Sequence, residues 1–268
     1  MELSADVKKK REDLLAEARF ALEQNPGDEL AIIWLGRRLA YLGDYRGAID
    51  VYTRGLELHP ESYRLRRHRG HRYITLRRFD DAIADLSTAA RLADGVPDQI
   101  EADGLPNAQN LPRSTTHSNI YYHLGLAHYL RGDFEASRAA YERCLEFSQN
   151  DDMRCASQYW LYLNNARLGR PLEASAMLEH VSADMDVIEN FDYQHLLLLF
   201  KGELTLNELL AASGGSDAIG GATLAYGVAA WYLLEGDVEL ARMAFQRAVE
   251  GAAWPAFGFI AAEAELSR

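Results

Sequence analysis

The sequence contains few cysteines and no long hydrophobic run. Cys144 and Cys155 are the only two cysteines among 268 residues, which is too few for a disulfide framework, and their spacing does not fit a metal site. We interpret both as small apolar core residues, because a free cysteine packs like a hydrophobic side chain. No apolar segment approaches the roughly 18 residues that a membrane-spanning helix needs, so the sequence argues against a transmembrane protein.

Positive charge is also scarce. The chain has 28 Lys and Arg against 40 Asp and Glu, which gives a net charge of −12. Contacts to phosphate need Lys and Arg, so this balance argues against general binding to nucleic acid or to an anionic membrane. The charge is uneven, because residues 29–94 carry 12 basic and 9 acidic side chains, whereas residues 95–268 carry 11 basic and 24 acidic ones. A basic segment therefore lies on an acidic protein.

No hydrophobic segment follows the Lys-Lys-Lys-Arg cluster at residues 8–11, so we expect no signal peptide. This predicts a cytoplasmic protein, with a periplasmic or secreted one as the alternative if a leader is removed. An apolar content of 48% is enough to bury a substantial core without a folding partner.

Motifs of catalysis and nucleotide binding are missing as well. The sequence has no Gly-x-Ser-x-Gly, no phosphate-binding loop and no His-Glu-x-x-His. His123 and His128 lie five positions apart and do not share a helix face, and arginines around His68 and His71 oppose a divalent cation. We therefore predict no catalytic residue, no cofactor and no metal site.

What the sequence does contain is a repeat with a period of 34 residues. Its clearest copy, residues 34–60, reads as two amphipathic helices joined by a Leu-Gly-Asp-Tyr turn and closed by a proline. Fixed-period self-similarity indicates a stacked helical solenoid, because no single unit can bury its apolar face alone. The pairs one period apart are Gly36 and Gly70, Pro26 and Pro60, Ala48 and Ala82, and Tyr45 and Phe79.

These residues resemble the tetratricopeptide repeat, and the chain is similar to bacterial members that carry a comparable Pro- and Asn-containing insert. The resemblance implies an all-α, right-handed superhelical α-solenoid of about six helix-turn-helix repeats with N- and C-terminal capping helices. The matching positions are Leu35-Gly36, Gly43-Asp44-Tyr45, Ala48, Tyr52 and Pro60 in the first repeat, and Leu124-Gly125, Gly132-Asp133-Phe134 and Tyr141 in the third.

We expect a single solenoid domain over residues 1–268. The last helix is rich in apolar residues such as Trp254 and Phe257. It either packs into the solenoid, which we favour, or forms a homodimer with a second subunit. In chain order, the expected parts are a capping helix at 1–28, repeats one and two at 29–94, an insert at 95–117, repeats three to six at 118–253 and a C-terminal helix at 254–268.

The insert at 95–117 lengthens the second repeat unit by 21 residues. It contains three prolines and has neither helical nor strand periodicity. A loop of this length is usually either functional or disordered. Its spaced apolar residues Ile100, Leu105 and Leu111 suggest an anchor onto a groove, and the alternative is a loose surface loop.

In tetratricopeptide proteins the first helix of each repeat lines a concave groove, so the resemblance implies a set of ligand contacts. Arg64, Arg67 and His71 share one face of the segment RLRRHRGHR, and Arg37 should be their neighbour in the preceding repeat. Converging guanidinium groups suit a carboxylate or phosphate, although pairing with nearby Asp and Glu on a solvated face is the alternative. The candidate ligand-binding residues are Arg37, Arg64, Arg67, His71, Asn119, Tyr122, Tyr129 and Tyr159.

We therefore predict a non-enzymatic scaffold that binds a protein or peptide in its concave groove. The acidic or carboxylate feature of the ligand would lie at the Arg- and His-rich end, and the tyrosines would contact its body. The alternative is a small-molecule-binding protein or hydrolase, with its site where the insert covers the groove. A closed cavity with convergent His and carboxylate groups would favour that alternative. Single-stranded nucleic acid is a third class, which the acidic remainder of the chain opposes.

Overall fold

The computed structural model describes residues 4–212 and 218–268, which form fourteen α-helices and no β-strand. No helix in this part of the chain is long and apolar enough to cross a bilayer. The helices are α1 (Ala5–Gln24), α2 (Glu29–Tyr41), α3 (Tyr45–Leu58), α4 (Tyr63–Thr75), α5 (Phe79–Ala93), α6 (Thr116–Arg131), α7 (Phe134–Glu146), α8 (Asp151–Arg167), α9 (Pro171–Ala176), α10 (Phe191–Lys201), α11 (Leu206–Ala212), α12 (Ala218–Leu234), α13 (Val238–Ala248) and α14 (Phe257–Leu266).

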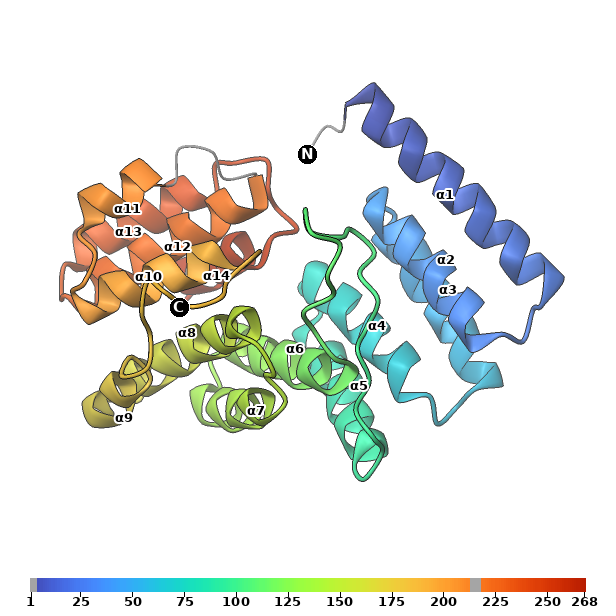
Figure 1. Cartoon of the computed structure of the whole chain (residues 1–268), viewed down its shortest axis with the longest axis horizontal. Helices are drawn as coiled ribbons and strands as arrows, with labels where there is room; N and C mark the ends of the chain where they lie inside the picture. Colours follow the sequence, from blue (N-terminus) through green and yellow to red (C-terminus); the bar gives the residue numbers. More distant parts are fainter. Residues whose placement is uncertain (1–3, 213–217) are drawn as a thin grey trace.

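The helices stack in chain order, which confirms the predicted all-α solenoid of tetratricopeptide-like repeats. Figure 1 shows the stack curving from α1–α5 through α6–α8 to α10–α14, so that its first and last thirds face each other across a concave side. The insert runs inside this concave side, between α4 and α14 (Figure 1).

The recurring Gly-Asp pair builds the turn inside a repeat. Gly132 follows α6 in the left-handed conformation (φ 87°), and Asp133 accepts the Ala136 N–H at 3.3 Å to cap α7. The turns before α3 and α13 have the same form, with φ of 88° at Gly43 and 86° at Gly236. This conformation strains any residue with a Cβ, and an N-cap carboxylate pairs an N–H that would otherwise lack a partner.

A second glycine in the repeat allows its two helices to approach closely. A Cβ added to Gly125 would lie 2.6 Å from the Tyr141 ring, and one added to Gly36 would overlap the Tyr52 ring. Both rings are buried, so each fills the space that the glycine leaves open. The glycine–aromatic spacing of the sequence is therefore a packing contact.

The C-terminal helix α14 packs into the concave side. Its residues 258–262 are buried, and the ion pairs Arg77–Glu263 (2.6 Å) and Arg167–Glu265 (2.8 Å) connect it to the α4–α5 turn and to α8. Most of the apolar residues of α14 therefore pack within the chain, whereas Leu266 at its end and Trp254 just before it are 38% and 40% exposed.

Gly258→Ala tests the close backbone contact between α14 and Ala222 of α12. The new Cβ would overlap the Ala222 carbonyl oxygen and lie 2.6 Å from its carbon, and a backbone group cannot move aside as a side-chain tip can. We expect a loss of about 1–3 kcal/mol in the free energy of unfolding, measured by urea denaturation. The control Gly251→Ala, whose Cβ would meet nothing within 4 Å, should change stability by less than about 0.5 kcal/mol. Equal stability of the two variants would contradict close docking of α14.

Candidate ligand-binding site

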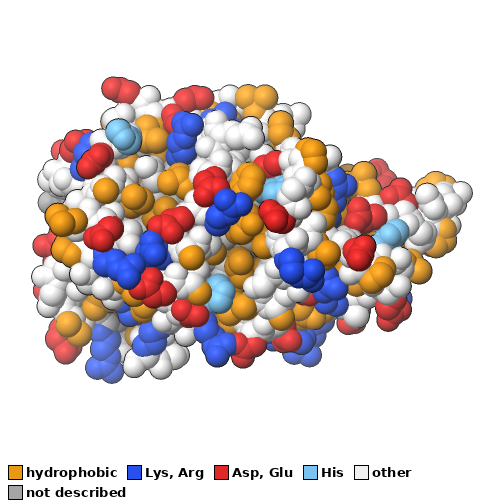
Figure 2. Space-filling view, turned by 90° about the horizontal axis from the view of Figure 1, so that it is seen from below, with side chains coloured by type: hydrophobic (Ala, Val, Ile, Leu, Met, Phe, Trp, Pro, Cys, Tyr) orange, Lys and Arg blue, Asp and Glu red, His pale blue; other side chains and the backbone are white. Residues whose placement is uncertain are grey.

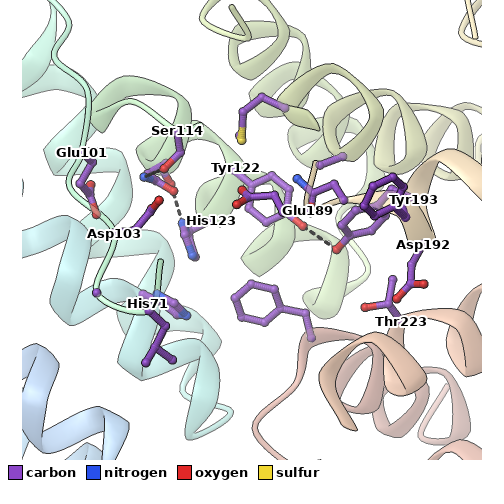
Figure 3. A pocket seen from close by; sticks show the side chains of 18 of the residues that line it. His71, Glu101, Asp103, Ser114, Tyr122, His123, Glu189, Asp192, Tyr193 and Thr223 are labelled. Carbon is purple, nitrogen blue, oxygen red and sulfur yellow. Dashed lines mark hydrogen bonds between the residues drawn. The ribbon is translucent and has the colours of Figure 1, made fainter. Parts of the chain in front are cut away.

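The concave side contains a cavity of about 790 Å³, a size in the range of ligand-binding pockets. One wall comes from α2 and α4, the floor from α6 and α8, and the opposite wall from residues 189–195 and from Phe257 at the start of α14. Figure 3 shows the lining side chains arranged around a common space, with the insert along one edge.

The insert is ordered and crosses the concave side. Its two arms pair with each other, since the Glu101 N–H donates to the Ser114 carbonyl (3.0 Å) and the Thr116 N–H to the Gln99 carbonyl (2.9 Å). Beyond these pairs, Arg38 of α2 donates to the Gly104 carbonyl at 3.2 Å. From the opposite wall, Glu189 accepts the Asn107 side-chain N–H at 2.8 Å. The insert therefore spans the cavity from wall to wall.

Polar contacts hold the insert, and the expected apolar anchor is wrong. Ile100, Leu105 and Leu111 are 69%, 53% and 50% exposed. The surface beneath the insert carries partly buried guanidinium groups, which need carbonyl or carboxylate partners where water is largely excluded. Backbone carbonyls and one carboxylate of the insert supply those partners, whereas its apolar side chains stay largely exposed, including Leu105, which lines the cavity.

Arg37 and Arg67 line the same cavity, but the chain supplies its own anion there. Arg67 Nη2 lies 2.9 Å from Glu101 Oε1, with the two side chains 9% and 13% exposed. Arg37 donates to the Ala102 carbonyl at 2.8 Å. Burial and the charge of Arg67 lower the pKa of His68, and its Nδ1 accepts an N–H of Arg67 at 3.0 Å. The position expected for a ligand carboxylate is thus filled by Glu101.

Two neutral histidines lie beside the arginines. The rings of His71 and His123 are 4.2 Å apart, and both contact Phe257. Burial lowers both pKa values well below the usual value, helped by the charge of Arg72 at His71 and of Arg67 at His123. His123 Nδ1 donates to the Asn119 carbonyl at 2.6 Å, so its Nε2 carries a lone pair.

These histidines have no catalytic partner in the described residues. Neither side chain hydrogen-bonds to a carboxylate or to a hydroxyl there, so neither ring is oriented by the kind of partner that a general base uses. Within residues 4–212 and 218–268, no three His, Cys, Asp or Glu side chains converge as a metal site requires.

The wall opposite the arginines is acidic and aromatic. Glu189 and Asp192 line it together with Tyr193 and Phe257, whereas Asp103 reaches the cavity from the insert, next to Glu101 (Figure 3). Burial raises the pKa of Asp103 and of Glu189. The charge of Arg37 opposes the shift at Asp103, the hydrogen bond from Asn107 opposes it at Glu189, and neighbouring carboxylates add to both shifts. The sequence pattern did not indicate this wall, because its residues lie in the 189–195 segment and at the start of α14, outside the groove positions of the repeat.

A buried carboxylate holds the acidic wall in place. Asp152 is fully buried, and its Oδ1 accepts the backbone N–H groups of residues 188, 189 and 190 at 3.1, 2.9 and 2.9 Å. Its Oδ2 accepts Nε of Arg113, at the end of the insert, at 2.7 Å. Sequence reasoning missed this role, because an Asp in the first turn of a helix is already explained by the helix dipole.

Five of the eight predicted ligand-binding residues line the cavity, and three do not. Arg64 contacts Gln99 and lies 3.7 Å from Glu29, outside the cavity. Tyr129 and Tyr159 are corrections, because their side chains are 1% and 0% exposed in the core and cannot reach a ligand. The predicted residues that do line the cavity are Arg37, Arg67, His71, Asn119 and Tyr122.

Comparison with known proteins identifies the repeats. Two family models described as tetratricopeptide repeat match residues 35–98 and 118–151. A tetratricopeptide repeat protein from Parabacteroides merdae has a TM-score of 0.54 and 15% identity, with 97% of this chain and 98% of that chain covered.

Two further solved structures are similar with lower scores. PilW, described as a type IV pilus biogenesis factor, has a TM-score of 0.49 and 15% identity, with 92% and 94% of the two chains covered. YrrB, described as a TPR protein with an unusual peptide-binding site, has a TM-score of 0.47 and 14% identity, with 92% of this chain and 97% of that chain covered. At these identities the likeness concerns the fold alone, and the matched segments are tetratricopeptide repeats.

Proposed function

We propose that this protein is a non-enzymatic binding module that holds a short segment of a protein or peptide in the cavity beneath the insert. The tetratricopeptide fold is typical of protein–protein interaction scaffolds, which supports the class of function. The observation that carries the proposal is the cavity of about 790 Å³ on the concave side, whose walls combine aromatic rings with charged groups.

A small-molecule-binding protein is the second candidate. The insert covers part of the groove, and His71, His123 and several carboxylates converge beneath it, as that alternative requires. Hydrolysis has no such support, because neither histidine contacts a carboxylate or a hydroxyl among the described side chains. Both candidates use the same cavity and differ only in the size of the ligand.

The surface charge supports a protein ligand over nucleic acid. Figure 2 shows Lys and Arg interspersed with Asp and Glu over the face seen there. Binding along a nucleic-acid backbone would favour a continuous basic stripe.

A cavity-blocking variant tests the proposed function. Ser114 lines the cavity, so Ser114→Trp should fill part of it and weaken the binding of hexapeptide mixtures to the immobilised protein by about tenfold or more. The matched control is Ser87→Trp, at an exposed position of α5. Equal binding by the two variants would remove the cavity as the site, and binding of small molecules alone would favour the second candidate.

An acidic ligand group can reach Arg37 and Arg67 only if Glu101 leaves them. Glu101→Gln removes the counter-charge of the buried Arg67, so we expect a loss of about 1–3 kcal/mol in the free energy of unfolding and faster hydrogen exchange in the insert. If the arginines also take a ligand carboxylate, acidic hexapeptides should bind this variant more tightly than the native protein. Unchanged exchange at the Glu101 N–H would show that the insert is held without this ion pair.

A further inference from the structure

Carboxylates outnumber guanidinium groups in the lining of the cavity. Four carboxylates line it, from Glu101, Asp103, Glu189 and Asp192, against two guanidinium groups. The ion pair between Arg67 and Glu101 removes one charge of each sign. Arg37 keeps its charge, because the Ala102 carbonyl that it contacts is neutral, but Asp103 and Glu189 together outweigh it. A cationic group would therefore be attracted into the space that remains, and an anionic group would be repelled.

Two acceptor atoms in this space have unmet hydrogen-bonding capacity. Asp103 Oδ2 is buried and has no hydrogen-bond partner in the described part of the chain. His123 is 4% exposed and lines the cavity, and its Nε2 lone pair accepts no hydrogen bond from the described residues. Leaving the buried Asp103 oxygen unpaired is costly, so a ligand that brings an N–H donor would gain free energy there, and the Nε2 lone pair of His123 can accept a second N–H.

The two acceptors lie in different electrostatic surroundings. Arg67 and Arg72 lie close enough to His123 for their charges to help lower its pKa, so a cation would be repelled there, and a neutral N–H donor fits best. Asp103 and Glu189 lie close enough together for the carboxylate of Asp103 to raise the pKa of Glu189, and among the described residues Arg37 is the one cation close enough to lower the pKa of Asp103. A cation between these carboxylates would offset their mutual repulsion.

Aromatic rings complete the acidic end of the cavity. Tyr122 and Tyr193 join their hydroxyl groups at 2.8 Å, and Trp160 donates to the Tyr122 hydroxyl at 3.0 Å, so these rings are fixed in orientation. Phe257 stands next to Tyr122, and Phe191 at the rim is 47% exposed. Fixed aromatic faces beside carboxylates favour a guanidinium or ammonium group through cation–π attraction.

We propose that the cavity recognises a basic residue, Lys or Arg, of a peptide segment, with its cationic group between Asp103 and Glu189 and a neutral N–H of the segment at His123. This ligand class rests on the proposed function, because it requires a peptide in the cavity. It differs from the acidic ligand predicted from the sequence, because Glu101 already neutralises the arginine that would have attracted one.

Binding of positional hexapeptide mixtures, each fixed at one residue type, tests this proposal on the full chain. We expect mixtures fixed as Lys or Arg to bind best, and the variant Asp103→Asn/Glu189→Gln to weaken their binding by about tenfold or more. Gln at position 189 keeps an acceptor for the Asn107 side chain. The matched control is Glu57→Gln, an exposed residue of α3 outside the cavity, which should leave binding unchanged. Phe191→Ala, at the exposed rim, provides a second variant that removes no charge.

The outcomes separate this proposal from the function on which it rests. A preference for Asp or Glu, or no charge preference, would overturn the basic ligand and leave peptide binding intact. No binding by any mixture would overturn both. If Nα-acetylarginine amide binds as tightly as the best mixture, the cavity recognises a small cation, and the peptide is not the ligand.

Discussion

Asp152→Ala is expected to lower the free energy of unfolding by about 3–5 kcal/mol, the range for removing one partner of a buried ion pair. The carboxylate is fully buried and accepts three backbone N–H groups and the guanidinium of Arg113. Alanine would leave all of these donors without their acceptor in a site that little water reaches. Urea denaturation measures the loss, and hydrogen exchange should show faster exchange at residues 188–190.

Two comparisons make the Asp152 prediction specific. Asp152→Asn keeps an oxygen for the backbone N–H groups but loses the charge opposite Arg113, so its loss should be smaller than that of Asp152→Ala. Glu146→Ala removes an exposed ion pair with Arg143 on α7 and should change stability by less than about 0.5 kcal/mol. A loss below about 1 kcal/mol for Asp152→Ala would mean that the 186–190 segment is held by other contacts.

The prediction also has a functional consequence. Asp152 positions the backbone of Glu189, and Glu189 forms part of the acidic wall of the cavity. The ligand affinity of Asp152→Ala should therefore fall more than that of an equally destabilised variant outside the cavity, for example Asp85→Ala, which removes the buried partner of Arg66 and Arg69.

The helix pairs could be predicted from the sequence because their determinants are local. The turn at Gly132 and Asp133 and the contact between Gly125 and Tyr141 involve residues less than one repeat apart, and they recur at fixed offsets. Because these contacts recur at fixed offsets, the period of the sequence is enough to predict them.

The cavity could be predicted only in part, because the insert, the 189–195 segment and Phe257 also line it, and the spacing of the repeat does not bring them together. Arg77 and Glu263, which connect α14 to the α4–α5 turn, lie 186 positions apart. The spacing of the repeat carries no information about such a pair. The sequence did indicate an anion site at Arg37 and Arg67, and an anion is present there, but it is Glu101 of the same chain.

Besides Asp152, a second buried carboxylate, Asp85 of α5, binds arginines of the neighbouring helix α4. The side chains of α4 divide by face, because residues three or four apart project together. Arg67 and His71 face the cavity, whereas Arg66 and Arg69 face α5 and share Asp85, which is 5% exposed. The sequence left open that these arginines pair with nearby Asp and Glu side chains. That interpretation holds for the face of α4 that carries Arg66 and Arg69.

Asp85→Ala is expected to lower the free energy of unfolding by about 3–5 kcal/mol, because it leaves two partly buried guanidinium groups without their counter-charge. Arg69 holds the carboxylate with two bonds of 2.6 and 2.8 Å, and Arg66 adds one of 3.2 Å. Arg69 also donates to Thr53 of α3 at 3.0 Å, so three successive helices meet at this group. The measurement is urea denaturation of the full chain.

Controls for Asp85→Ala separate loss of the charge pair from loss of packing. Asp81→Ala removes the exposed pair with Arg78 and should change stability by less than about 0.5 kcal/mol. The double variant Asp85→Ala/Arg69→Leu removes both charges of the two-bond pair, so we expect it to be more stable than Asp85→Ala alone. A double variant that is less stable would show that the stem and Thr53 contact of Arg69 matter more than its charge. Because Asp85 lies outside the cavity, peptide binding by the folded fraction of Asp85→Ala should match that of the native protein.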